Sequence, residues 1–268
     1  MARRPEREIS AKAEEVLKVL DMWSIPVDPF IICEQEGIEL APGSYGKGFD
    51  GRIRYLQDVD TFALAYRDRG PGRTVGRVRF TIGHELGHYY LHRDYLLSGH
   101  SHGSQTNFRS HDEMEEEADV FAAALLMPME LFRSAVRRYR QDVCVLSELC
   151  ELADNRLQTS VTSTVRRYCQ ADIEPCAAVF SSEGVTRWAW YSEDMRRLGM
   201  GYMPFGQALP RMSRTSKDVA ELTTKGTIEG EVETDAWFER SQHNGNLWEE
   251  AMLLGESELV LTYLTLAE

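Results

Sequence analysis

The spacing of apolar residues predicts that the first two thirds of the chain are mostly helical. Ser10 can cap a helix whose apolar positions recur every three to four residues up to Leu20. Asp28 followed by Pro29 is typical of the start of a short second helix, which Gly37 ends. The same periodicity predicts further helices at about 77–92, 114–127, 129–139, 143–153 and 160–168.

Short apolar runs predict two groups of strands. The first group comprises 38–40, 52–56 and 61–66, of which the last two can form a hairpin. After Cys169 the composition shifts, and strands are expected at 177–180, 186–191 and 259–266. The polar stretch 93–112 is interpreted as a mobile surface loop.

These elements predict an α+β protein in three parts. Residues 1–140 form a mostly helical domain with a small N-terminal sheet, and residues 141–170 form a helix-turn-helix-like segment. Residues 171–268 form a smaller α+β domain, which we interpret as regulatory or sensory.

Charge and cysteine content narrow the class of protein. The 268 residues carry 30 basic and 43 acidic side chains, a formal charge of −13, which argues against a general nucleic-acid-binding role. The five cysteines form no C-x-x-C pair and fit free thiols in a reducing compartment. The charged first residues do not resemble a signal peptide, and we find no apolar run long enough to span a bilayer. We therefore expect a cytoplasmic protein with no membrane partner.

One motif contains candidate metal-binding and catalytic residues. Residues 84–88 read HELGH, and residues four apart lie on one face of an α-helix, so His84 and His88 can chelate one Zn²⁺. Glu85, about 100° around the helix, can reach a water molecule at the metal and act as its general base. His92 continues the stripe, either at the surface or beside a ligand. Two histidines that merely form hydrogen bonds are the simpler alternative.

A third ligand is expected because a catalytic zinc takes three protein ligands and one water molecule. The second helix, EMEEEADVFAAALLMP at 113–128, is amphipathic, and its alanines allow close packing on the first. Glu115 lies on the face of Ala118 and is the preferred ligand, with Glu117 as the alternative. Asp119 can accept a hydrogen bond from the Nδ1–H of a ligand histidine.

The two motifs together resemble the ImmA/IrrE family of zinc metallopeptidases. The resemblance rests on TIGHELGHYYLH at 81–92 and E-x-E-A-D-x-F-A-A-x-L-L-M-P at 115–128, and extends over roughly 10–170. It implies a zincin-like, specifically gluzincin-like, catalytic domain, a helix-turn-helix-like segment and, in some members, a GAF-like sensory domain. It assigns His84, His88 and Glu115 to the zinc and Glu85 to catalysis, while Asp119 stands where many members carry Asn.

The family implies a zinc-dependent endopeptidase that cleaves a partner transcriptional repressor, encoded nearby, in stress response or mobile-element regulation. Three alternatives remain. Residues 143–168 could bind DNA, although their acidic side chains argue against it; the zinc site could be catalytically silent and serve protein binding; and Cys169 with Cys176 could serve a sensor rather than packing. Tyr89, Tyr90 and the 93–112 loop are candidates for stabilising the oxyanion, although packing in the core is the favoured interpretation of the two tyrosines.

Overall fold

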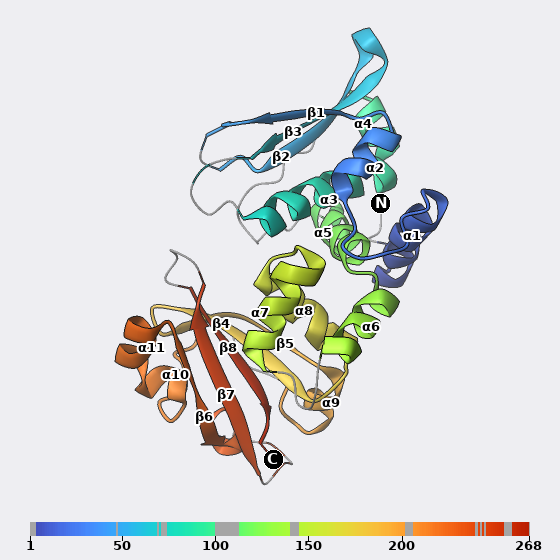
Figure 1. Cartoon of the computed structure of the whole chain (residues 1–268). Coiled ribbons are helices and arrows are strands. Elements are labelled where there is room, and N and C mark those ends of the chain that lie inside the picture. The colour runs from blue at the N-terminus through green and yellow to red at the C-terminus, as the bar shows by residue number, and fades with distance from the viewer. Residues whose placement is uncertain are drawn as a thin grey trace. The chain divides into compact units, whose positions relative to one another are not determined.

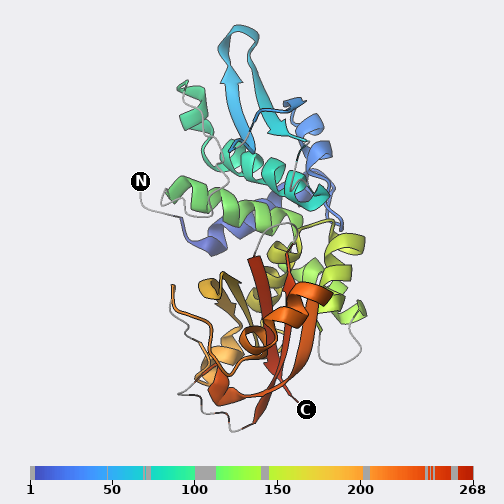
Figure 2. The same cartoon turned by 90° about the vertical axis from the view of Figure 1, so that its left-hand side faces the viewer.

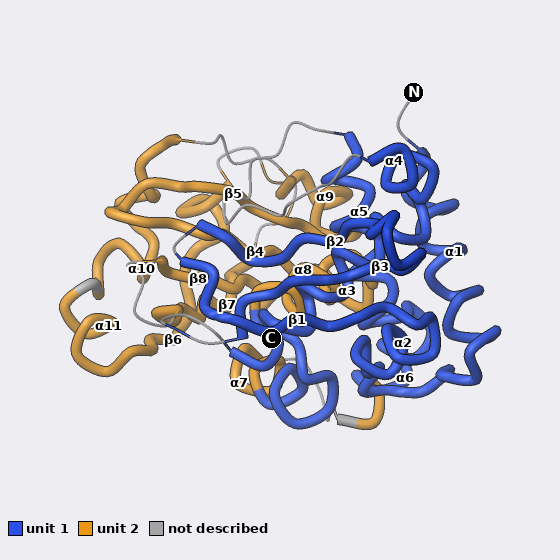
Figure 3. Tube along the Cα trace, turned by 90° about the horizontal axis from the view of Figure 1, so that it is seen from above, with its two compact units in different colours: residues 1–136, 151–161 blue, residues 137–150, 162–268 orange. Residues whose placement is uncertain are grey.

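The structure, a computed structural model, describes residues 4–46, 48–68, 70, 74–99, 113–139, 145–201, 206–238, 241, 243, 245–254 and 259–267, excepting the side chains of residues 139 and 219. These residues belong to two compact units, one from 1–136 and 151–161 and the other from 137–150 and 162–268 (Figure 3). The segment 141–170, predicted as a separate part, thus contributes to both units. Its helix-turn-helix character stays a prediction.

The first unit combines helices with a small sheet (Figure 1). Its helices up to residue 139 are α1 (Glu6–Val19), α2 (Pro29–Gln35), α3 (Val75–Leu91), α4 (Arg93–Leu97), α5 (Glu113–Leu126) and α6 (Met129–Tyr139). α5 packs between α1 and α3, as the view in Figure 2 shows. Their apolar faces meet in a core that contains Leu17, Leu86 and Phe121, all with no exposed surface.

The start of α1 differs from the prediction, whereas the start of α2 agrees with it. Pro5, not Ser10, is the N-cap residue of α1, and its carbonyl accepts hydrogen bonds from the N–H groups of Glu8 and Ile9. Acidic side chains in this first turn favour the earlier start because they face the positive end of the helix dipole. At α2, the carboxylate of Asp28 accepts a hydrogen bond from the N–H of Phe30 at 3.0 Å, which confirms the predicted cap.

The sheet of the first unit has the strand order β1-β3-β2, formed by β1 (Glu39–Gly43), β2 (Gly51–Leu56) and β3 (Thr61–Arg67). β2 and β3 are antiparallel and joined through the 3-10 turn η1 (Gln57–Val59), which confirms the predicted hairpin. β1 runs parallel to β3. β2 is therefore an edge strand of this sheet, and it packs against α3.

The region after α6 contains both predicted helices. They are α7 (Leu146–Glu151), which continues into the π-helical turn η2 (Leu152–Leu157), and α8 (Val161–Ala171). Tyr168 of α8 packs edge-on against Tyr263, and both hydroxyls donate to Glu174. One face of α8 is therefore buried within the second unit.

The second unit contains a five-stranded antiparallel sheet of order β5-β4-β8-β7-β6. Its strands are β4 (Cys176–Ser182), β5 (Val185–Tyr191), β6 (Thr227–Glu233), β7 (Asn246–Leu253) and β8 (Leu259–Leu266). Its later helices and 3-10 turn are α9 (Glu193–Arg197), α10 (Arg214–Lys217), α11 (Val219–Lys225) and η3 (Thr234–Ala236). β6 and β7 were absent from the prediction, whereas β4, β5 and β8 were expected.

Helices cover both faces of this sheet. Consecutive residues of a strand point to opposite faces. Glu249 of β7 accepts a hydrogen bond from the N–H of Thr215 in α10, and Glu250 accepts one from the N–H of Leu146 in α7. α7 and α10 therefore lie on opposite faces, as Figure 1 shows. The described residues form an α+β structure, in which most of the helical residues lie, along the chain, after the first sheet and before the second.

No helix in the described part of the chain combines the length and the apolar character needed to cross a membrane.

Candidate metal centre

Helix α3 carries the HELGH motif in its buried second half. Thr74 caps the helix by accepting a hydrogen bond from the N–H of Arg77, so the regular part begins upstream of the motif. His84 and His88 are 4% and 0% exposed, and their rings lie 4.8 Å apart at 76°. As predicted from their spacing, the two imidazoles lie on one face of the helix, with their Nε2 atoms 3.1 Å apart.

Small residues bring α5 close to this face of α3. A Cβ atom added at Gly87 would lie 2.9 Å from the Cα of Ala118, closer than side chains pack. One added at Gly83 would lie 3.4 Å from the Cβ of Ala122, an ordinary contact. The close approach expected from the glycines and alanines is thus present, and it is tightest beside the histidines.

Glu115, in the first turn of α5, completes a triangle of ligand atoms. The Nε2 atoms of His84 and His88 are 3.1 Å apart. One carboxylate oxygen of Glu115 lies 3.1 Å from the Nε2 of His84, and the other lies 3.4 Å from the Nε2 of His88. Among the described residues, this is the group of His, Cys, Asp and Glu side chains that can share one metal ion.

The dimensions of the triangle fit a tetrahedral Zn²⁺ site. Zinc binds imidazole nitrogen and carboxylate oxygen at about 2.0–2.2 Å, so neighbouring ligand atoms of a tetrahedron are about 3.3–3.5 Å apart. The two Nε2 atoms are 3.1 Å apart, and each lies 3.1 or 3.4 Å from a different oxygen of Glu115, so the three side chains are close enough to share one such ion. Two imidazoles and one carboxylate also form a ligand set used by catalytic zinc, with the fourth position left for water.

Asp119 lies one turn after Glu115 and fixes the orientation of His84. Its Oδ1 is 2.8 Å from the Nδ1 of His84, so the Nδ1–H donates to the carboxylate and the Nε2 lone pair faces the triangle. Burial lowers the pKa of His84, but the hydrogen bonds to Asp119 and Glu115 outweigh burial and raise this pKa to about 10. A metal ion that binds the Nε2 of His84 therefore has to displace the proton that these acidic side chains favour on the ring.

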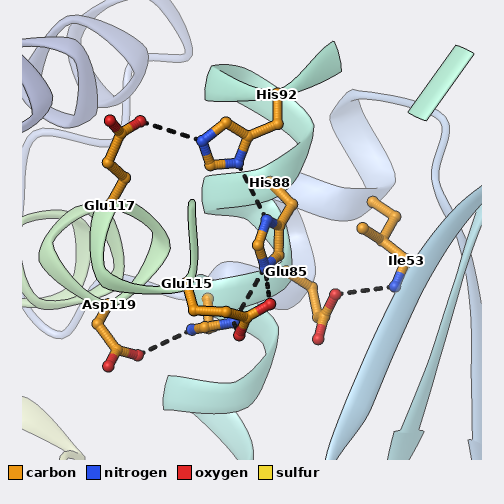
Figure 4. A network of polar contacts seen from close by, with 8 residues as sticks. Ile53, Glu85, His88, His92, Glu115, Glu117 and Asp119 are labelled. Atoms are coloured by element: carbon orange, nitrogen blue, oxygen red, sulfur yellow. Dashed lines mark hydrogen bonds and ion pairs between the residues drawn. The ribbon is translucent and has the colours of Figure 1, made fainter. Parts of the chain in front are cut away.

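The side chain of Glu85 points away from α5 and toward the edge strand β2 (Figure 4). Its side chain is fully buried, and Oε2 accepts a hydrogen bond from the N–H of Ile53 at 2.8 Å. A Cβ atom at Gly51 would lie 3.1 Å from the other carboxylate oxygen and 2.5 Å from Thr81. Gly51 therefore lets β2 approach the carboxylate, a contact that the sequence pattern did not predict.

Glu117 and His92 form a second cluster on the other side of His88. His92 is buried rather than at the surface, and its Nδ1 lies 3.0 Å from the Nδ1 of His88. Its Nε2 lies 3.1 Å from Glu117, which also accepts hydrogen bonds from Arg4. Glu117, the alternative third ligand, is thus engaged away from the triangle. Of the two positions predicted for His92, at the surface or beside a ligand, the structure shows the second.

The two tyrosines that follow the HELGH motif, Tyr89 and Tyr90, make their contacts away from the triangle. The hydroxyl of Tyr89 donates to Glu36 at 2.8 Å, and its ring packs edge-on against Phe62. Burial, followed by a hydrogen bond to Glu36, raises the pKa of Tyr90, whose ring stacks on Phe121. Both therefore pack in the core. The predicted loop 93–112 begins instead with α4, and its residues 100–112 lie outside the described residues.

Comparisons with known proteins point to one family for this region. Residues 71–158 match the sequence profile of the family described as the IrrE N-terminal-like domain, peptidase family M78. The radiation response metalloprotease IrrE of Deinococcus deserti is 32% identical over 134 residues, which are 43% of this chain and 47% of that protein. The chain thus matches about half the length of this curated relative.

A solved structure resembles nearly the whole chain. A Mycobacterium tuberculosis transcriptional regulator superposes with a TM-score of 0.59 and covers 96% of this chain and 76% of its own. The sequence identity is 13%, so the likeness concerns the fold alone. The profile match, by contrast, includes all residues of the triangle together with Glu85.

Proposed function

We propose that this chain, whose residues 71–158 match the IrrE N-terminal-like domain, is a zinc-dependent endopeptidase that cleaves a specific partner protein. The observation that carries the proposal is the triangle of His84, His88 and Glu115, at zinc spacing, with the buried carboxylate of Glu85 on the next residue of α3. A purely structural zinc site prefers four protein ligands and has no use for a carboxylate in that place.

In this proposal each residue has a distinct role. His84, His88 and Glu115 would hold the zinc ion, which when bound would supply a Lewis acid for activating water near neutral pH and polarising a carbonyl group. Glu85 accepts the proton of the attacking water and passes it to the leaving amine. The N–H of Ile53 orients the Glu85 carboxylate, and Asp119 orients His84.

The proposed substrate is a transcriptional repressor encoded near this protein, cleaved in response to stress or during induction of a mobile element. The support is the likeness to a radiation response metalloprotease and the resemblance of the motifs. The cysteines Cys33, Cys150, Cys169 and Cys176 are free thiols in the structure, which favours a reducing cytoplasm as the site of action. Direct binding to nucleic acid is not part of the proposal.

We further propose that the second unit senses the signal that switches the enzyme. Its five-stranded antiparallel sheet with helices on both faces is the kind of α+β structure expected for a GAF-like domain. The 3.9 Å separation of the Cys169 and Cys176 sulfur atoms is compatible with packing and does not by itself indicate a redox role.

The test uses Glu85→Gln and the repressor encoded beside this gene. Zinc content is measured on purified protein, and cleavage of the repressor is followed on a gel. The variant is expected to keep its zinc and to cleave at least about 100-fold more slowly, the usual contribution of a general base. Undiminished cleavage by Glu85→Gln would remove this residue from the mechanism, and wild type without zinc would refute the proposal.

A DNA-binding regulator is the second candidate, because the solved structure of similar fold is named a transcriptional regulator. In this chain the region 143–168 contributes α7 and α8, and the face of α8 around Tyr168 is buried. A gel-shift experiment at physiological salt with the promoter of the adjacent repressor gene distinguishes the two. Specific binding without cleavage would favour the regulator.

A further inference from the structure

We propose that His92 is a positioning residue that holds His88 in the tautomer required for zinc binding, and that Glu117 and Arg4 hold His92 in turn. The inference rests on the proposed zinc site and extends it by three residues. It is carried by a row of hydrogen-bonding contacts that runs from His88 through His92 to Glu117 (Figure 4) and on to Arg4 in the N-terminal segment.

His88 lies between the triangle and His92. Its Nε2 faces His84 and Glu115, so a metal ion held there needs the lone pair of Nε2. A neutral imidazole carries its single proton on the other nitrogen, here Nδ1. His88 is fully buried, and its Nδ1 lies 3.0 Å from the Nδ1 of His92.

His92 lies between His88 and Glu117. Two N–H groups cannot form a hydrogen bond with each other, so the Nδ1 of His92 must be the acceptor when the Nδ1 of His88 is the donor. The proton of His92 then belongs on Nε2, and that atom lies 3.1 Å from a carboxylate oxygen of Glu117. Each tautomer in the row is thus determined by its neighbour.

The carboxylate of Glu117 lies between His92 and Arg4. Glu117 accepts hydrogen bonds from the backbone N–H of Arg4, at 2.6 Å, and from its guanidinium group. The same guanidinium donates to the carbonyl of Leu91 at 2.9 Å, one residue before His92. Arg4 therefore holds the carboxylate against the end of α3, where it can only accept from His92.

The Nδ1 atoms of His84 and His88 therefore have different hydrogen-bonding partners. The Nδ1 of His84 donates directly to Asp119, at 2.8 Å, whereas the Nδ1 of His88 is linked to the carboxylate of Glu117 through His92. Both carboxylates come from α5, two and four residues after Glu115 in sequence. The inference predicts that loss of the acceptor on His92 weakens zinc binding through His88, although His92 does not contact the ion.

The experiment measures the dissociation constant for zinc by competition with a chromophoric chelator. His92→Leu removes the acceptor, whereas in His92→Asn the side-chain Oδ1 can occupy the place of Nδ1 and keep it. Partners of metal-binding histidines typically contribute 10–100-fold in metal affinity. His92→Leu is expected to bind zinc 10–100-fold more weakly, and His92→Asn is expected to stay within a few-fold of wild type.

Tyr90→Phe is the matched control. It removes one buried hydroxyl from the same part of α3 without touching the row, so zinc affinity should not change. Thermal unfolding of each variant in chelator establishes that the metal-free folds are comparable. Should His92→Leu unfold, Glu117→Gln provides the second test, with an expected loss of zinc affinity in the same direction.

A spectroscopic signature separates this role from simple packing. Long-range ¹H–¹⁵N spectra of zinc-loaded wild type should show His88 protonated on Nδ1 and His92 protonated on Nε2 alone. A His92 protonated on Nδ1, or equal zinc affinity in wild type and His92→Leu, overturns the positioning role while leaving the zinc peptidase intact. A wild type that binds no zinc overturns both proposals.

Discussion

The contact between Gly87 and Ala118 makes a sharp prediction about the packing that brings Glu115 to the histidines. An alanine at Gly87 would place its Cβ 2.9 Å from the Cα of Ala118 and 3.1 Å from its carbonyl oxygen. Both neighbours are backbone atoms, which cannot rotate away, so α3 and α5 must separate. Ala118 lies between Glu115 and Asp119, so the separation also displaces both carboxylates.

Gly83→Ala is the matched comparison because it makes the same change one turn earlier in the same helix. Its Cβ would meet the Cβ of Ala122 at 3.4 Å, which requires no movement. Each substitution gains about 1 kcal/mol from helix propensity. At Gly87 the steric overlap costs about 1–3 kcal/mol of folding stability, which opposes this gain. Gly87→Ala should therefore be less stable than Gly83→Ala by about 2 kcal/mol.

Urea unfolding of the metal-free variants measures this difference, and a scan of thermal unfolding should show a gap in Tm of roughly 4–8 °C. Zinc affinity should fall in Gly87→Ala and stay near the wild-type value in Gly83→Ala. Equal stability of the two variants, or higher stability of Gly87→Ala, would refute the reasoning that the helices meet backbone to backbone at this point.

Two further predictions concern β2 and the second sheet. Gly51→Ala should slow repressor cleavage and leave zinc content unchanged, because its Cβ would lie 2.5 Å from Thr81 and 3.1 Å from a Glu85 oxygen; an unchanged cleavage rate would contradict the role of the β2 contact. Burial, with repulsion from Glu229 and Glu148, raises the pKa of Glu250 from 4.5 to about 7. Between these values the unfolded chain releases a proton that the folded protein keeps, so stability should fall as pH rises from 4.5 to 7, by about 3 kcal/mol in all. Glu250→Gln should abolish most of this fall in urea unfolding measured against pH, and a slope equal to that of wild type would count against it.

Much of the metal centre could be predicted because its determinants are local. The four-residue spacing of His84 and His88 follows from the helical repeat, and the alanines of α5 indicated which face packs against α3. Glu115 and Asp119 could then be placed on that face by the same repeat. The structure brings these four side chains together as the spacing predicted.

Contacts between distant segments could not be predicted in this way. Arg4 and Glu117 are 113 residues apart in sequence, and no periodic pattern relates them. The same applies to the N–H of Ile53, which reaches Glu85 across 32 residues. His92 could be predicted as a continuation of the histidine stripe, but its partner Glu117 became evident only from the fold.

The strand β7 was missed because two acidic residues interrupt its apolar pattern. Glu249 is fully buried, yet it accepts hydrogen bonds from the N–H groups of Arg214 and Thr215, the Thr215 hydroxyl and the Trp237 indole. A buried carboxylate is tolerated when such donors surround it. Here tertiary contacts outweigh the local pattern, which by itself is typical of an exposed segment.

The central claim is that α3 and α5 bring His84, His88 and Glu115 onto one zinc ion. An anomalous difference map from crystals of the zinc-loaded protein, with data collected on both sides of the zinc absorption edge, tests it most directly. The account predicts one strong peak at bonding distance from the Nε2 atoms of both histidines and from a carboxylate oxygen of Glu115. A peak bound instead by His92 and Glu117, or a fully loaded protein with no peak between the two helices, would contradict it.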